Sequence, residues 1–212
     1  MILFENTKVM NFDGAFRGMR NPMNSWGYAD SYVSNFTDDG KEGFVMGKND
    51  LDLAQRLIKA GSDHRKFLRQ IFVSVDITAP LYWWKEFDTY KVATVANSCS
   101  TMHKIHSKEF VLADFSHERM SEKARTVLLG VIEQLNESRD RYNETHDIQD
   151  WDDMIQLLPT SYNQRRTVTL NYEILRNIYE SRNNHKLPEW RVDFMEWIHF
   201  FLPYAEKLIT YC

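Results

Sequence analysis

Residues 71–87 read IFVSVDITAPLYWWKEF, and this stretch decides the fold class. Apolar residues recur there at the period of two that is typical of a half-buried strand, at Ile71, Val73, Val75 and Ile77. Pro80 stands at a helix-start position, so residues 81–87 are expected to form about two helical turns. The chain is then expected to extend again over residues 90–95. The order of strand, short helix and strand indicates an α+β domain.

Helices are expected on both sides of this stretch, because apolar residues recur there at helical spacing. The longest begins at Ser121, a favourable N-cap residue, and reaches about Tyr142. The others are expected over residues 49–61, 170–178 and 190–201. The second half of the chain is therefore expected to be mainly helical.

Residues 1–48 are expected to form loops with little regular structure. Turn-forming pairs and triplets interrupt the apolar pieces there, at Asp13-Gly14, Asn21-Pro22 and Asp38-Asp39-Gly40. The whole chain contains no internal repeat and no low-complexity linker. Residues 1–212 are therefore expected to form a single domain.

The composition limits the classes of partner. The 26 basic and 30 acidic residues give a formal charge of -4, so no global field attracts nucleic acid or an anionic membrane. No run of about 18 apolar residues occurs, which argues against a membrane span. The two cysteines, Cys99 and Cys212, cannot form a disulfide framework. We expect a cytoplasmic protein with neither nucleic acid nor membrane as a partner.

Two blocks of residues have an informative order and spacing. The first starts in a short turn before the strand and runs on past the short helix, through His64, Ala79-Pro80, Glu86-Phe87, Thr89-Tyr90-Lys91, Ser98 and Ser100. The second lies far downstream and consists of Leu158-Pro159, Tyr162, a strand over residues 167–171, Asn177 and Arg182. Each feature alone is common in proteins, so the information lies in their joint order.

In that order and spacing the chain resembles the flavin-dependent thymidylate synthases over most of its length after residue 50. The resemblance implies an α+β domain with the thymidylate synthase-complementing-protein-like fold, a central antiparallel or mixed sheet with long helices. It implies reductive methylation of deoxyuridylate at C5, with methylenetetrahydrofolate as carbon donor, FAD as hydride source and NADPH as its reductant. It also implies a homotetramer with sites at subunit interfaces, in a bacterial cell or a phage-infected host.

The same resemblance implies roles for individual residues. Positions that hold FAD correspond to His64, Tyr90, Lys91 and Asn177. Positions that bind the pyrimidine deoxynucleotide correspond to Glu86, Ser98, Ser100 and Arg182. Arg182 is also the catalytic candidate, because a cation there can stabilise negative charge that develops on the pyrimidine.

The chain departs from the family at its charged positions. Thr89-Tyr90-Lys91 replaces Arg-His-Arg, so only Lys91 is charged, and it lacks the bidentate fork of arginine. Two family arginines fall on Ile155 and Glu173, and a glutamine falls on Glu86. FAD binding is therefore expected to be weak or lost. Two alternatives stay open: a catalytically silent nucleotide-binding protein on this scaffold, and a related enzyme that modifies another pyrimidine nucleotide.

Several other groups have both a functional and an ordinary interpretation. Cys99, His103 and His106 have a spacing that can suit zinc, but a second close cysteine is missing. The acidic residues around Trp151 are explained by a helix start. An aromatic pair, Trp83-Trp84, is typical of a core or a subunit interface. Arg165-Arg166 either replaces the missing arginines or is a solvated pair ahead of a strand. No metal is expected.

Overall fold

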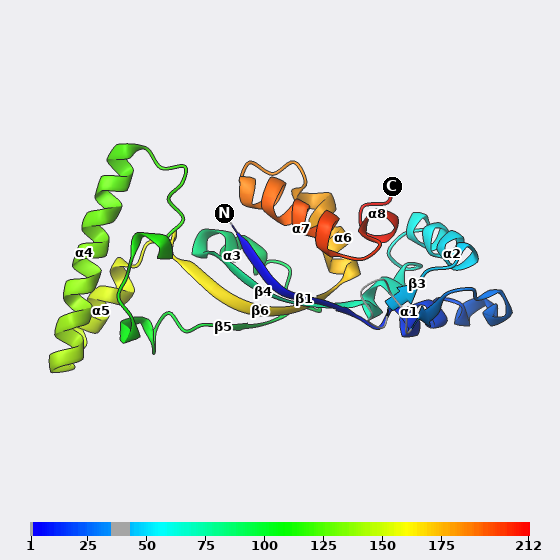
Figure 1. Cartoon of the computed structure of the whole chain (residues 1–212), viewed down its shortest axis with the longest axis horizontal. Coiled ribbons are helices and arrows are strands. Elements are labelled where there is room, and N and C mark those ends of the chain that lie inside the picture. Colours follow the sequence, from blue (N-terminus) through cyan, green and yellow to red (C-terminus); the bar gives the residue numbers. More distant parts are fainter. Residues whose placement is uncertain (1, 35–42) are drawn as a thin grey trace. The chain divides into compact units, whose positions relative to one another are not determined.

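A sheet of four strands organises the computed structural model, which describes residues 2–34 and 43–212 (Figure 1). The strands follow the order β1–β4–β6–β5 and comprise β1 (Leu3–Met10), β4 (Phe72–Pro80), β5 (Val95–Ser98) and β6 (Asn163–Asn171). Two shorter strands, β2 (Tyr32–Ser34) and β3 (Gly43–Val45), form an antiparallel pair. This mixture of sheet and helices confirms the predicted α+β class.

The α-helices in chain order are α1 (Phe12–Met19), α2 (Lys48–Lys59), α3 (Leu81–Phe87), α4 (Glu122–Thr145), α5 (Ile148–Leu157), α6 (Tyr172–Arg182), α7 (Met195–Phe201) and α8 (Ala205–Leu208). Short 3-10 turns are η1 (Asn21–Met23), η2 (Trp26–Tyr28), η3 (Lys66–Gln70), η4 (Ile105–Ser107) and η5 (Leu112–Asp114), and η6 (Glu189–Phe194) is a π-helical turn. The helices predicted over residues 49–61, 81–87 and from Ser121 are confirmed. The stripe over residues 170–178 divides, because β6 continues to Asn171 before α6 begins.

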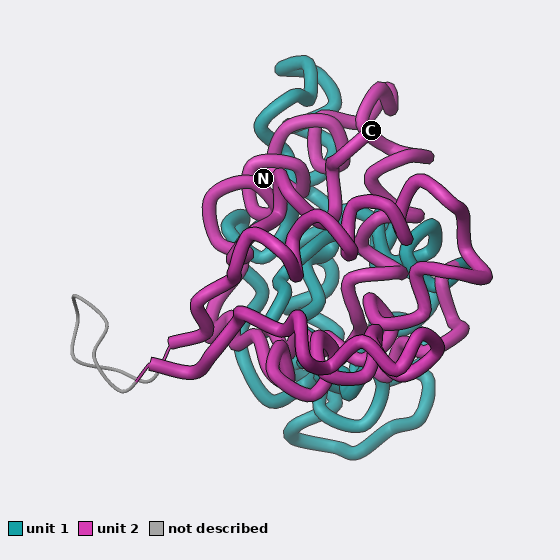
Figure 2. The backbone as a smooth tube through the Cα atoms, turned by 90° about the vertical axis from the view of Figure 1, so that its right-hand side faces the viewer, with its two compact units in different colours: residues 1–3, 76–89, 96–167 teal, residues 4–75, 90–95, 168–212 magenta. Residues whose placement is uncertain are grey.

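The contacts of the chain divide it into two compact units (Figure 2). The first consists mainly of residues 76–89 and 96–167. The second contains the described part of residues 4–75, together with residues 90–95 and 168–212. The single domain over residues 1–212 stays a prediction.

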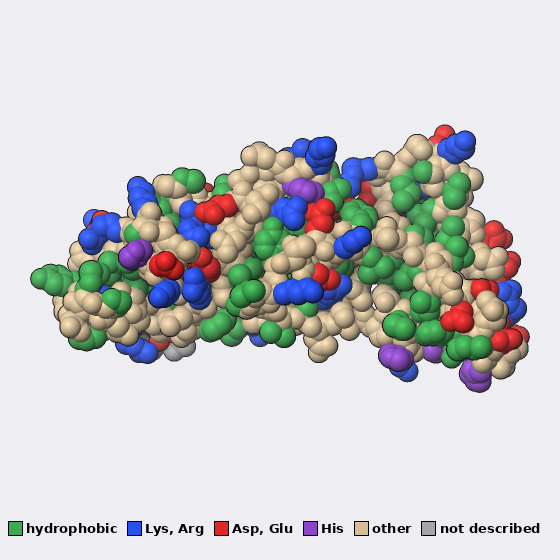
Figure 3. All heavy atoms as spheres, turned by 180° about the vertical axis from the view of Figure 1, so that it is seen from behind, with side chains coloured by type: hydrophobic (Ala, Val, Ile, Leu, Met, Phe, Trp, Pro, Cys, Tyr) green, Lys and Arg blue, Asp and Glu red, His purple; other side chains and the backbone are tan. Residues whose placement is uncertain are grey.

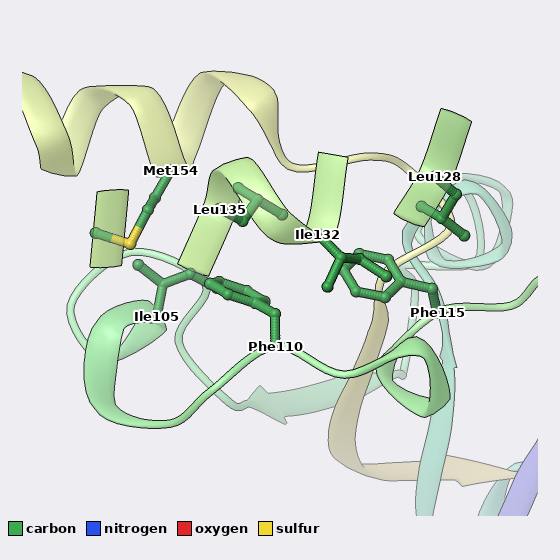
Figure 4. Packing of buried hydrophobic residues seen from close by; sticks show 7 residues of the cluster. All are labelled: Ile105, Phe110, Phe115, Leu128, Ile132, Leu135 and Met154. Carbon is green, nitrogen blue, oxygen red and sulfur yellow. The ribbon is translucent and has the colours of Figure 1, made fainter. Parts of the chain in front are cut away.

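The first unit has a core between α4, α5 and the loop segments that face them (Figure 4). Ser121 caps α4 by accepting a hydrogen bond from the Ala124 amide at 3.3 Å, as the sequence predicts. Three residues of the apolar stripe of α4 are buried against Met154 of α5 and against two phenylalanines. The cluster consists of Ile105, Phe110, Phe115, Leu128, Ile132, Leu135 and Met154.

The second unit has an aromatic core. Phe12 stacks on Phe44 with ring centroids 5.2 Å apart and meets the edges of Tyr172 and Tyr204 at 5.5 and 5.7 Å. The Tyr172 hydroxyl donates to the Pro203 carbonyl at 2.7 Å, so its polar end is satisfied inside the core. This packing fixes the start of α6, which carries two of the predicted site residues.

The prediction of loops over residues 1–48 is wrong. The described part contains β1, α1, two 3-10 turns and the β2–β3 pair. The Asp13-Gly14 pair was predicted to form a turn, but Gly14 lies inside α1. A Cβ there would stand 2.3 Å from Asn11 Oδ1, so the glycine permits a close approach of the Asn11 side chain. The Asp38-Asp39-Gly40 turn lies outside the described residues.

The extended segment predicted over residues 90–95 is also wrong. Residues 92 and 93 form a turn, and Ala93 has a φ of 59°. The Thr94 amide donates to the Lys91 carbonyl at 3.3 Å and closes this turn. The strand β5 begins only at Val95, because this turn interrupts the extended backbone before it.

Basic and acidic side chains are interspersed on the face shown in Figure 3, which agrees with the small net charge. Among the described residues, no helix has the length and apolar content needed to cross a bilayer.

Candidate functional site

Helix α6 positions two candidates, Asn177 and Arg182, through a defined start. Asn171 ends β6 and caps the helix, since its Oδ1 accepts from the Ile174 amide at 3.0 Å. Asn177 and Arg182 are both half-buried, the first in mid-helix and the second in the last turn. A strand that changes directly into a capped helix holds both side chains on a rigid element.

Arg182 lies against Tyr90, so two predicted site residues are brought together. Arg182 Nε donates to the Tyr90 hydroxyl at 3.0 Å. The guanidinium carbon lies 5.8 Å from the ring centroid of Tyr90 and 5.5 Å from that of Trp190. Such aromatic contacts hold a guanidinium in a fixed plane, and the planar fork suits bidentate recognition of a phosphate or carboxylate. The arrangement can therefore present a preorganised cation to an anionic ligand.

Asn177 contacts an arginine that the sequence analysis missed. Arg65 Nη2 donates to Asn177 Oδ1 at 3.4 Å, and Arg65 Nε donates to the two carboxylate oxygens of Glu173 at 3.0 and 3.2 Å. The position of Arg65 next to His64 was the one available signal. Glu173 is thus paired within its own unit, and its charge does not act alone on a ligand.

His64 and Lys91 are exposed side chains of the second unit. His64 lines a cavity of about 500 Å³ whose other walls include Met19, Leu57 and Phe67. Lys91 precedes the turn at residues 92 and 93, so its charge is presented to solvent. Neither residue has a described hydrogen bond to Arg182 or Asn177.

Glu86, Ser98 and Ser100 belong to the first unit. Glu86 is half-buried in α3, and Ser98 is exposed at the end of β5. Ser100 Oγ accepts from the amides of Met102 and His103 at 3.2 and 2.9 Å, so it fixes the loop that follows β5. These contacts give Ser100 a local structural role in addition to its predicted one.

Ser100 also lines a cavity of about 520 Å³. Lys108 Nζ lies 2.5 Å from Asp114 Oδ1, and this hydrogen bond raises the pKa of Lys108. Burial raises the pKa of Tyr162 on another wall, so its hydroxyl stays protonated at neutral pH. Lys104 and Arg165 complete the basic part of the lining. The cavity combines these cations with the apolar surface of Phe110, which suits a ring that carries an anionic group.

Arg165 and Arg166 are both ion-paired in β6. Arg165 Nη2 lies 2.8 Å from Asp76 Oδ2, and Arg166 Nη1 lies 2.8 Å from Asp88 Oδ1. The Arg166 guanidinium also covers the Trp84 ring, 4.2 Å from its centroid. The idea of a solvated pair ahead of a strand is right only in that Arg165 is exposed, because both arginines lie inside β6 and Arg166 is largely buried.

Trp83 and Trp84 are core residues, as the more ordinary interpretation holds. Their side chains are fully buried, and Trp84 Nε1 donates to the Gln164 carbonyl at 2.9 Å. Asp147 caps α5 at 3.0 Å from the Gln149 amide, and Asp150 pairs with Arg141 at 2.7 Å. The acidic residues around Trp151 therefore belong to a helix start.

Within the described residues, no three His, Cys, Asp or Glu side chains are grouped so that they could hold a metal ion. The spacing of Cys99, His103 and His106 does not become a cluster in space. The zinc interpretation thus gains no support from the fold.

The combination of the β1–β4–β6–β5 sheet with these helices is the fold of the flavin-dependent thymidylate synthases. One similar structure is thymidylate synthase X (ThyX) from Helicobacter pylori with FAD and dUMP. It superposes with a TM-score of 0.72 at 17% identity, covering 99% of this chain and 97% of that chain. A second, flavin-dependent thymidylate synthase ThyX from the same organism complexed with FAD and dUMP, gives a TM-score of 0.67 at 17% identity, covering 98% and 97%.

No protein-family model and no curated protein matches the sequence. At 17% identity the two structures establish a common fold, and residue roles need separate arguments. With 99% of this chain covered, the likeness nevertheless extends to the described residues before residue 50, which the motif spacing does not reach.

Proposed function

We propose that this chain is a divergent flavin-dependent thymidylate synthase that binds FAD and a pyrimidine deoxynucleotide. The observation that carries the proposal is the Arg182–Tyr90 contact at the end of α6, in a chain that shares the fold over nearly its whole length. Tyr90 stands where the family has the histidine of Arg-His-Arg, and it contacts Arg182, the arginine at the nucleotide position.

The residues of the second unit fit a flavin in part. Asn177 supplies amide donors and His64 an imidazole beside a cavity, whereas Lys91 is the one cation of its triplet. When bound, reduced FAD would supply the hydride for methylation, with NADPH as its reductant and methylenetetrahydrofolate as the carbon donor. The task of Arg182 would be to bind the nucleotide and to stabilise negative charge on the pyrimidine.

The other predicted nucleotide contacts, Glu86, Ser98 and Ser100, belong to the first unit. Ser98 and Ser100 lie at and after the end of β5, and Ser100 borders the cavity with a basic lining. Glu86 replaces a glutamine, and an ionised carboxylate accepts hydrogen bonds without donating any. This difference favours the alternative in which the enzyme acts on another pyrimidine nucleotide.

A catalytically silent nucleotide-binding protein is the second candidate. Charged groups that could hold FAD are missing at several family positions. Thr89 and Tyr90 carry no charge, Ile155 takes the place of an arginine, and Glu173 forms an ion pair with Arg65. A protein on this scaffold that keeps Arg182 but cannot hold FAD would bind the nucleotide without turnover.

Loose FAD binding is the first expected result. Asn177 and His64 favour binding, whereas the missing guanidinium forks weaken it, so FAD should be lost during purification. Adding FAD to the apoprotein and following the quenching of flavin fluorescence measures the affinity. The absence of quenching at about 100 μM FAD, equivalent to about 5 to 6 kcal/mol, would favour the silent protein instead. Free FAD with an unrelated protein of similar size serves as the control.

A homotetramer is the second expected result. The exposed apolar residues of α7 and its surroundings include Val192, Phe200 and Phe201, which a subunit contact would cover. Light scattering at micromolar concentration measures the mass in solution. The mass of a monomer would contradict the predicted homotetramer and the predicted sites at subunit interfaces.

A further inference from the structure

Glu173 is a buried carboxylate in the first turn of α6, with 6% of its side chain exposed. A buried charge without a partner is strongly unfavourable. Arg65 compensates the charge of Glu173 in an ion pair, since its Nε lies 3.0 and 3.2 Å from the two carboxylate oxygens. The two residues are 108 positions apart in the sequence, so the pair is a product of the fold.

The same guanidinium also orients Asn177. Arg65 Nη2 lies 3.4 Å from Asn177 Oδ1. A guanidinium has only donors, so the atom that faces it must be the carbonyl oxygen of the amide. The Asn177 Nδ2 is therefore turned away from Arg65, with its N–H donors available for an acceptor atom.

The spacing on α6 explains why an arginine is needed. Glu173 and Asn177 are four residues apart, so their side chains lie on one face of the helix. The Arg65 fork reaches both at once, with Nε on the carboxylate and Nη2 on the amide. A lysine carries one nitrogen centre and can keep the ion pair without holding the amide.

We propose that Arg65 is a positioning residue for ligand binding, which acts through Asn177. Anchored by Glu173, it keeps the amide N–H donors of Asn177 aimed at an acceptor atom of the ligand, such as a flavin carbonyl or a phosphate oxygen. The inference rests on the proposed function, in which Asn177 contacts FAD. Arg65 itself need not touch the ligand.

The Arg65→Lys variant separates positioning from stability. It keeps the ion pair with Glu173, so its melting temperature should stay close to that of the wild type. Its FAD affinity, measured by fluorescence quenching, should fall about fivefold, the typical effect of one hydrogen bond. Arg20→Lys is the matched control, because Arg20 is a buried arginine elsewhere in the same unit that pairs with Asp50 at 2.6 Å. That control should bind FAD as the wild type does.

A double-mutant cycle tests the route through Asn177. In the Asn177→Ala background, Arg65→Lys should lower FAD affinity no further. A full fivefold loss in that background, or wild-type affinity of Arg65→Lys alone, overturns the proposal.

A measurement without ligand keeps the inference independent of flavin binding. The side-chain amide resonances of Asn177 in 15N-labelled protein should shift in Arg65→Lys and stay in place in Arg20→Lys. If the wild type binds no FAD but this shift occurs, the positioning holds and only the flavin function fails. Unshifted Asn177 resonances in Arg65→Lys overturn the positioning, whatever the affinity for FAD.

Discussion

Replacement of Arg182 by alanine should lower the affinity for deoxyuridylate by about 1.5 to 3 kcal/mol, the range for a hydrogen bond to a charged group. This corresponds to about 10- to 150-fold in the dissociation constant. The loss should be large because Tyr90 and Trp190 hold the guanidinium in one orientation before the ligand arrives. Calorimetric titration of both proteins with deoxyuridylate measures it.

The controls for Arg182 distinguish charge, geometry and stability. Arg182→Lys keeps the charge without the fork, so its affinity should lie between those of wild type and Arg182→Ala. The melting temperature of Arg182→Ala should fall by only a few degrees, since about 1 kcal/mol shifts a chain of this size by roughly 2 to 4 °C. Equal affinities of wild type and Arg182→Ala would show that the nucleotide site has been abandoned and that only the fold is retained.

Replacement of Asp50 by alanine should reduce the free energy of unfolding by about 3 to 5 kcal/mol, because it leaves the buried Arg20 charge without its partner. Arg20 Nε lies 2.6 Å from Asp50 Oδ1, and the exposed fractions of the two side chains are 4% and 2%. Asp50 Oδ2 also accepts from the Ser31 amide at 2.8 Å. Urea unfolding of the two proteins, followed by circular dichroism, measures the difference.

Asp52→Ala is the matched control for this change, because Asp52 makes an exposed ion pair with Arg56 at 2.8 Å. Such surface pairs contribute about 0 to 1 kcal/mol. A loss at Asp50 no larger than that at Asp52 would contradict the structural role of the buried pair.

Asp50 also predicts a pH dependence of stability. Burial alone would raise the pKa of this carboxyl, but hydrogen bonds from Ser31, Arg20 and Asp30 outweigh burial and hold the pKa below its ordinary value. The stabilisation is therefore complete at neutral pH. The stabilisation declines as the pH falls below about 4. There Asp50 becomes protonated in the unfolded chain while it is still ionised in the folded protein. The unfolding free energy of Asp50→Ala should vary less with pH in this acid range than that of the wild type.

The fold and the candidate site residues could be predicted from the motif spacing, but the contacts between those residues could not. The order of His64, the strand at residues 71–78 and the helix at residues 81–87 led to the fold that the solved structures share. The spacing of this block and of the downstream block from Leu158 led to Tyr90 and Arg182 as candidates. It did not show that these two side chains touch, because 92 residues separate them and neither has a local pattern that reports the other.

Arg65 escaped prediction for a related reason. Next to His64 in a polar turn, it has the appearance of a solvated charge. Its importance depends on Glu173 and Asn177, more than 100 residues downstream. The sequence showed Glu173 as a negative charge in place of an arginine, and the fold turned that charge into one half of a buried pair.

The sequence by itself determined the elements whose pattern is local. Alternation over residues 71–77 specified β4, and the capped apolar stripe from Ser121 specified α4, because backbone periodicity places such residues on one face. Only the tertiary structure decided that Phe12 and its neighbours form α1, since aromatic partners from distant segments stabilise that short helix. It also decided which charges meet at α6. Contacts between residues far apart in the sequence form only when the chain folds. They cannot be predicted from the interactions of residues that are neighbours in the sequence.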